Sequence, residues 1–204
     1  MSKKWKKRRN SFKRKVGKRG PIKKRILIVC EGGKTEPNYF RCFRVSSAVV
    51  EVLGAGYNTL SLVRRAIVKR DEAKENDAEF QIVWCVFDKN NFPALNFNNA
   101  LSLARQENIK VAYSNEAFEI WYLLHYDYID TALSREQYKQ MLTDRLGYTY
   151  EKNSEDMYKE LLEKQENAIR NSERLLQNYH PHTPARDNPS TTVHLLVNEL
   201  NSYI

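Results

Sequence analysis

Two acidic residues follow directly on apolar segments of the kind that form buried strands. Glu31 comes after the run 26–30, and Asp88 comes after the run 82–87. In an open parallel sheet, sites form beyond the carboxyl ends of the strands, so the two carboxylates share one cleft if the two strands are neighbours. Mg²⁺ keeps several waters and takes only one or two protein carboxylates, which leaves room for a phosphate. Either acid alone is better explained as a cap on the next helix, but the pair favours a metal site.

The segment Gly32-Gly33-Lys34-Thr35 is similar to the end of an NTPase phosphate-binding loop, but the glycine count is wrong. That loop requires a glycine five residues before Gly33, where Ile28 stands, and Glu31 inside the loop would repel a triphosphate. Lys34 therefore either contacts a phosphate in the cleft or is simply a solvated lysine. The histidines and cysteines show no zinc-site spacing, and no nucleophile-elbow pattern is present in the chain.

The elements that must position these acids alternate between apolar runs and amphipathic segments. This alternation predicts βαβ units and an α/β fold with a parallel sheet of about four strands flanked by helices. Thr35 and Asn115 are expected to cap two of the helices. The expected strands are 26–30, 48–53, 82–87 and 110–113, and the expected helices begin at Thr35 and span 59–76, 98–108 and 118–126.

From Ser134 onward we expect helices and no strand. Three apolar pairs in the segment 155–179 recur at intervals of seven, which predicts one long helix with a packing seam, within the chain or between two chains. They are Leu161-Leu162, Ala168-Ile169 and Leu175-Leu176. Asn188-Pro189 is typical of a helix start. The expected organisation is a basic arm over 1–25, an α/β domain over 26–130 and a helical region over 131–204, with helices at 135–146, 155–179 and 189–203.

The positive charge of the chain is concentrated in its first segment. Residues 1–25 hold 14 of the 34 Lys and Arg residues and no acid, whereas the rest of the chain holds 20 bases and 25 acids. With few apolar side chains this arm is expected to be disordered and to bind a polyanion in a salt-sensitive way, or else to act as a solubilising tail. Nucleic-acid contacts are expected from Lys3, Lys4, Trp5, Lys6, Lys7, Arg8, Arg9, Lys13, Arg14 and Lys15.

The composition also limits the cellular compartments in which we expect the protein. No apolar run approaches the ~18 residues of a membrane span, and the basic first segment lacks the apolar stretch of a secretory signal. Cys30 and Cys85 lie inside apolar runs, where a thiol packs as a small hydrophobe. We therefore expect a cytoplasmic protein without disulfides, and no membrane partner.

Four ordered blocks of the sequence stand out together: 29–40, Phe87-Asp88, 110–115 with 118–125, and 188–193. These blocks resemble the RloB-like family, over a region from about Lys24 to the C-terminus. The resemblance implies a single-domain version of the TOPRIM (topoisomerase-primase) fold. It also implies an association with restriction-modification and abortive phage-infection systems, often beside an ATPase.

The resemblance also implies roles for individual residues. The TOPRIM glutamate falls on Glu31 and the first aspartate of the Asp-x-Asp motif on Asp88, while the second falls on Asn90. A neutral amide in place of a carboxylate lowers the charge that holds Mg²⁺, so any metal is expected to bind weakly. Possible accessory acids are Glu36, Glu116 and Glu119, although Glu116 is better explained as a charge at a helix start.

Two functions remain in competition at this point. The first is a metal-dependent nuclease acting on DNA or RNA in prokaryotic anti-phage defence. In it Mg²⁺ or Mn²⁺ is held by Asp88 with Asn90, Glu31 serves as general acid/base or ligand, and Lys34 balances the anion. The alternative is a catalytically degenerate nucleic-acid-binding or regulatory subunit, partnered with an ATPase. Asn90 favours the alternative, and the oligomeric state is open.

Overall fold

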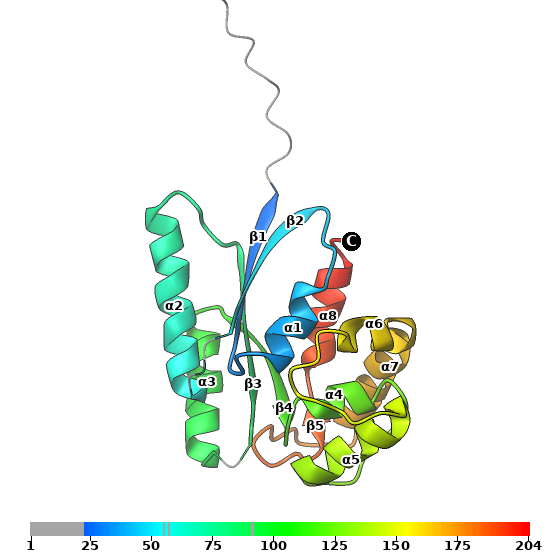
Figure 1. The fold of residues 1–204 in the computed structure, drawn as a ribbon. Helices are drawn as coiled ribbons and strands as arrows, with labels where there is room; N and C mark the ends of the chain where they lie inside the picture. The colour runs from blue at the N-terminus through cyan, green and yellow to red at the C-terminus, as the bar shows by residue number, and fades with distance from the viewer. Residues whose placement is uncertain (1–22, 55, 57, 91) are drawn as a thin grey trace, which may run out of the picture.

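The computed structural model describes residues 23–54, 56, 58–90 and 92–204. Its centre is a five-stranded sheet in the order β2-β1-β3-β4-β5, with four parallel strands and one antiparallel edge strand (Figure 1). The predicted α/β class and mostly parallel sheet are confirmed. The strands are β1 (Lys24–Cys30), β2 (Ala48–Gly54), β3 (Ile82–Asp88), β4 (Lys110–Asn115) and β5 (Ser190–Thr191).

Helices cover both faces of this sheet. Two long helices, α2 and α3, lie on one face, and the remaining helices lie on the other (Figure 1). No helix among the described residues is long and apolar enough to cross a membrane. The helices are α1 (Thr35–Arg41), α2 (Thr59–Glu75), α3 (Ala94–Gln106), α4 (Glu119–Leu123), α5 (Arg135–Leu146), α6 (Met157–Leu161), α7 (Gln165–Leu176) and α8 (Val193–Asn201).

Strand β1 shows why its sequence is continuously apolar. Successive side chains of a strand point to opposite faces, so Ile26 and Ile28 enter the core below α1 and α8, while Leu27 and Val29 enter the core below α2 and α3. All of them are fully buried. A strand covered on both faces needs apolar residues at every position, and this is the pattern that predicted it.

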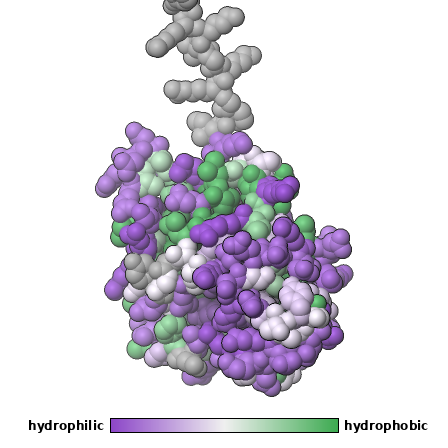
Figure 2. All heavy atoms as spheres, viewed as in Figure 1, coloured by the Kyte–Doolittle hydropathy of each residue, from purple (hydrophilic) through white to green (hydrophobic). Residues whose placement is uncertain are grey.

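The surface differs between the two ends of the molecule. On the face shown in Figure 2, the side chains over α5–α7 are mostly hydrophilic, whereas apolar side chains gather around β1 and β2. Strand β2 is an edge strand, and its Val49 is 43% exposed.

The single long helix expected over 155–179 is wrong. A 3-10 turn at Leu162–Lys164 separates α6 from α7. The break lets the two pieces pack on different partners, because α6 contacts α1 while α7 contacts α4, α8 and β5. The first member of each apolar pair, Leu161, Ala168 and Leu175, is buried in the same core, whereas Leu162 is 48% exposed, so the packing seam exists but is one residue wide and crosses the break between the helices.

The expectation of no strand after Ser134 is also wrong. Ser190–Thr191 forms β5, antiparallel to β4, and α8 begins only at Val193 rather than at Pro189. Two polar residues carry no apolar alternation, so β5 leaves no periodic signal. Its place is fixed instead by hydrogen bonds with β4, such as Ser114 Oγ with Thr191 Oγ1 at 3.1 Å.

Both expected caps are wrong, and one helix starts early. The Thr35 hydroxyl donates to the carbonyl of Lys152 at 2.6 Å, and the Asn115 amide donates to the carbonyl of Asp187 at 2.9 Å. Each side chain therefore ties two distant segments together instead of closing a helix end. Helix α3 begins at Ala94, four residues before the expected start.

Candidate active site

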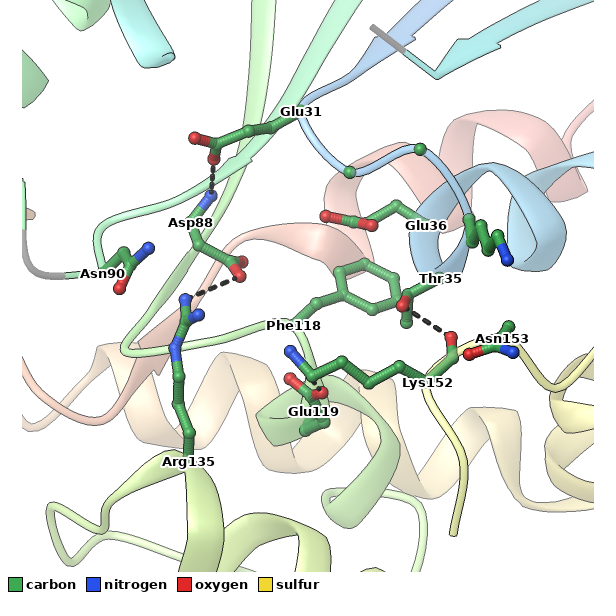
Figure 3. Close-up of a pocket in the computed structure, with 13 residues that line it drawn as sticks. Glu31, Thr35, Glu36, Asp88, Asn90, Phe118, Glu119, Arg135, Lys152 and Asn153 are labelled. Atoms are coloured by element: carbon green, nitrogen blue, oxygen red, sulfur yellow. Dashed lines mark hydrogen bonds and ion pairs between the residues drawn. The ribbon is translucent and has the colours of Figure 1, made fainter. Parts of the chain in front are cut away.

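A pocket of about 380 Å³ lies at the carboxyl ends of β1 and β3 (Figure 3). The two strands are neighbours, with Cys30 paired to Val86. The pocket is therefore at the edge where a parallel sheet places its sites. It is lined by Glu31, Gly32, Gly33, Lys34, Thr35, Glu36, Asp88, Asn90, Phe118, Glu119, Arg135, Lys152 and Asn153.

The structure brings Glu31 and Asp88 together at this edge. Oε2 of Glu31 accepts a hydrogen bond of 3.1 Å from the backbone N–H of Asp88 (Figure 3). Strand pairing thus fixes one carboxylate against the backbone of the other acid. Because both residues sit at strand ends rather than in long loops, their relative position is held by the sheet itself.

Two further acids, Glu36 and Glu119, deepen the negative charge of the pocket. Glu36 lies on α1 and is 6% exposed, and Glu119 opens α4 and is 2% exposed. The Glu36 carboxyl lies against Gly32, where an added Cβ would overlap Oε2. Both were expected as accessory acids, and both line the pocket beside Asp88.

Burial and mutual repulsion disturb the titration of these acids. Burial raises the pKa of Glu31 from its ordinary 4.5 to about 7, although the hydrogen bond from Asp88 opposes the shift. Burial also raises the pKa of Asp88, and the charges of Glu36 and Glu119 raise it further against the opposing Arg135. Burial likewise raises the pKa of Glu36. A cation in the pocket would relieve this repulsion.

Two cationic side chains face the acids, and sequence reasoning missed both. Arg135, the first residue of α5, lies 3.4 Å from Oδ2 of Asp88, and Lys152 lies 3.4 Å from Oε1 of Glu119. Neither follows an apolar strand or belongs to a recognisable motif. The one local signal is the capping box of Ser134, which fixes where α5 and hence Arg135 begin.

Lys152 reaches the pocket from the connection between α5 and α6, residues 147–156, which we call the strap. The strap is fastened to α1 by two hydrogen bonds. Thr35 donates to the Lys152 carbonyl at 2.6 Å, and Asn38 donates to the Asn153 carbonyl at 3.3 Å. The helix that follows Glu31 therefore holds the segment that closes the opposite side of the pocket (Figure 3).

The other residues singled out from the sequence fall in different places. Lys34 and Asn90 line the pocket, Lys34 at its exposed rim and Asn90 with a positive φ of 47°. Glu116 does not line the pocket, although its carbonyl accepts a hydrogen bond of 3.2 Å from the Asn90 N–H. The residues expected to contact nucleic acid, from Lys3 to Lys15, lie outside the described residues.

The donors in the pocket fit a hard divalent cation. Glu31, Asp88 and Asn90 offer oxygen atoms, which Mg²⁺ and Mn²⁺ prefer. Within the part of the chain that the structure describes, no three His, Cys, Asp or Glu side chains are arranged to hold a metal ion. Asp88 and Asn90, with Glu31 beside them, therefore offer oxygen donors to a cation that completes its shell with water or phosphate.

Fold and pocket together define an α/β protein with an acidic site at the carboxyl ends of the central strands of a mostly parallel sheet. Among protein families, the sequence profile of the RloB-like proteins matches residues 26–200. The chain belongs to the RloB-like family, as the four sequence blocks predicted. A search of curated proteins finds no match.

Proposed function

We propose that this RloB-like protein is a metal-dependent nuclease with a TOPRIM-like site, acting on DNA or RNA. The observation that carries the proposal is the placement of Glu31 and Asp88 on adjacent strand ends, joined by a hydrogen bond within one pocket. A divalent cation held there by Asp88 with Asn90 would stabilise the negative charge that develops on a phosphate.

The chain's own groups supply the remaining chemistry. Because the pKa of Glu31 is about 7, this carboxyl can hold or release a proton near neutral pH and so act as general acid or base toward the attacking or leaving oxygen. Lys34 at the rim and Lys152 inside the pocket balance the charge of the phosphate backbone. Phe118 and the strap residues Lys152 and Asn153 complete the lining of the pocket.

Substitution of the two acids tests the proposal. Purified protein should cleave or nick nucleic acid with Mg²⁺ or Mn²⁺ and lose this activity in EDTA. Glu31→Ala and Asp88→Ala should each lower cleavage by at least about 10²-fold. Glu136→Ala is the matched control, because the Glu136 side chain is 81% exposed on α5. Cleavage that survives both pocket substitutions would refute the nuclease.

A degenerate regulatory or nucleic-acid-binding subunit is the second candidate, and Asn90 favours it. An amide replaces the second carboxylate expected at this position, so the site binds metal more weakly than a three-carboxylate set. Asn90→Asp separates the two functions. A latent nuclease should gain activity, whereas a subunit should gain none, and its nucleic-acid binding should survive Asp88→Ala.

The resemblance supports a role in the bacterial or archaeal cytoplasm, in anti-phage defence and beside an ATPase partner. Under this proposal, cells that carry the protein with its neighbouring ATPase should resist phage infection. Glu31→Ala should abolish that protection if the pocket is catalytic. Protection by the Glu31→Ala protein would instead favour the regulatory subunit.

A further inference from the structure

Arg135 pairs with Asp88, the acid assigned to the proposed metal. Its guanidinium NH2 group lies 3.4 Å from Oδ2 of Asp88, and the two side chains are 25% and 16% exposed. Figure 3 shows Arg135 rising from α5 toward the end of β3, on the side of the pocket opposite Glu31 and Glu36. A cation bound at Asp88 would repel a guanidinium this close, so the two compete for one carboxylate.

Within the described residues, the Arg135 guanidinium also has an unpaired hydrogen-bond donor. The Nε of Arg135 is buried and has no hydrogen-bond partner among the described residues. A guanidinium presents its N–H groups in a planar fork that matches phosphate oxygens, and an unpaired buried donor costs free energy until it finds an acceptor. Pairing with Asp88 alone therefore leaves Arg135 incompletely satisfied, and a phosphate in the pocket would complete it.

Lys152 forms a similar ion pair with a second acid, Glu119. It comes from the strap and lies 3.4 Å from the nearly buried Glu119, which it approaches from the side of Thr35, whereas Arg135 enters from the side of Asn90 (Figure 3). The pocket thus has acids from the ends of β1 and β3 and from α1 and α4, and two cations that reach two of these acids from α5 and the strap.

We propose that Arg135 pairs with Asp88 in the resting pocket and moves to the substrate phosphate when a divalent cation takes Asp88. Arg135 and Lys152 then form the phosphate subsite. The inference rests on the proposed function and names the group of the nucleic acid that the pocket holds, a backbone phosphate. It makes one unusual demand: removal of Arg135 must strengthen metal binding while it weakens cleavage.

Mn²⁺ titration of the full chain, followed by electron paramagnetic resonance, tests this demand without any turnover. Arg135→Gln should tighten Mn²⁺ binding by about tenfold, because a competing cation is gone. Asp88→Asn should lose the binding. Arg145→Gln is the matched control on the same helix, since Arg145 pairs at 2.6 Å with Asp127 outside the pocket, and it should leave Mn²⁺ affinity unchanged.

Cleavage measured at saturating Mn²⁺ completes the test. Arg135→Gln should cleave at least about tenfold more slowly than wild type despite its tighter metal binding. Arg135→Lys, which keeps the charge without the fork, should bind Mn²⁺ like wild type and cleave at an intermediate rate. A merely structural role would weaken metal binding and cleavage together.

The outcomes separate the two proposals. Wild-type protein that binds no Mn²⁺ overturns the proposed nuclease and this inference with it. Wild-type protein that binds Mn²⁺ and loses it in Asp88→Asn, while Arg135→Gln shows no gain in affinity, overturns the inference alone. If Arg135→Gln fails to fold by circular dichroism, the Arg135→Lys protein decides, and weaker Mn²⁺ binding in it counts against the proposal.

Discussion

Folding raises the pKa of the Glu31 carboxyl, so this group is more often protonated in the folded protein than in the unfolded chain. Its pKa is about 7 in the folded protein, because burial disfavours the charged form, against an ordinary value of 4.5. Between these two pH values the folded state holds a proton that the unfolded state has released. The folded protein is therefore stabilised at low pH, and this contribution is lost as the pH rises from 4.5 through 7.

Glu31→Gln should consequently stabilise the metal-free protein above neutral pH. The glutamine oxygen still accepts the hydrogen bond from Asp88, but no charge is buried. We expect a gain of about 1–2 kcal/mol in the free energy of unfolding at pH 8, discounted for the partial exposure of the group, and almost none at pH 5. Urea denaturation in EDTA at the two pH values measures it.

The control for this substitution is Glu51→Gln. The Glu51 side chain is 45% exposed on β2, so its replacement should change the free energy of unfolding little at either pH. A Glu31→Gln protein that gains as much at pH 5 as at pH 8 would show that the gain does not come from the buried charge.

Residue chemistry was predictable from sequence where a strand end positions the residue. Glu31 and Asp88 each follow an apolar run, so their meeting needed only that the two strands be neighbours. Arg135 and Lys152 were not predictable, because they reach the pocket from segments whose only link to it is tertiary packing. Nothing in their local sequence distinguishes them from solvated cations.

The loop between β1 and α1 contains two glycines, and only Gly32 is closely packed against a neighbouring side chain. A Cβ on Gly32 would overlap Oε2 of Glu36, whereas a Cβ on Gly33 would meet nothing within 4 Å. Gly32→Ala must displace the buried Glu36 carboxyl, which we expect to cost about 1–3 kcal/mol of stability.

Gly33→Ala should be nearly neutral in the same measurement. Thermal unfolding of both variants at pH 8 tests the contrast. If the nuclease proposal holds, Gly32→Ala should also lower cleavage, because Glu36 lies beside Asp88. Equal stability of the two variants would mean that Glu36 finds another position at no cost.

The position of the strap also depends on α1, through hydrogen bonds from Thr35 and Asn38. Thr35→Val removes the 2.6 Å hydrogen bond to the Lys152 carbonyl and keeps the shape of the side chain. We expect a loss of about 1 kcal/mol and faster amide hydrogen exchange in residues 148–156. Thr35→Ser, which keeps the hydroxyl, should retain slow exchange. Unchanged exchange in Thr35→Val would assign the strap's order to the Asn38 bond and Lys152 instead.

Elements were predictable in proportion to the length of their apolar pattern. Strands β1 and β3 and helix α2 follow from runs and periodicity within a residue or two of their ends. The two-residue β5 and the turn that divides α6 from α7 did not, because each is set by hydrogen bonds and packing partners far away in the sequence. Heptad spacing alone favours one straight helix and says nothing of different partners.

At the scale of the whole molecule, the first described residues and the pocket lie at opposite ends of β1. Strand β1 begins at Lys24, close to where residues 1–22 join the described protein, and ends at Cys30, directly before Glu31 (Figure 1). Seven residues of strand span about 23 Å. We predict that the effect of residues 1–22 on binding is separable from the chemistry of the pocket.

Deletion of residues 1–22 should weaken nucleic-acid binding without slowing the proposed cleavage step. The deleted segment holds 11 Lys and Arg residues and no acid, so the slope of log K against log salt should become shallower by several units, about 0.9 for each phosphate that the arm neutralises. The melting temperature should stay unchanged, because β1 is intact. Filter binding at salt concentrations from about 50 to about 200 mM measures the slope.

Single-turnover cleavage at saturating protein then isolates the pocket. Its rate should change less than about threefold in the deleted protein, because the arm acts on the encounter and not on the transition state. Asp88→Ala is the converse control, with an unchanged salt slope and no cleavage. A deletion that leaves the salt slope intact would return the arm to the role of a solubilising tail, and one that abolishes single-turnover cleavage would place it at the pocket despite the length of β1 between them.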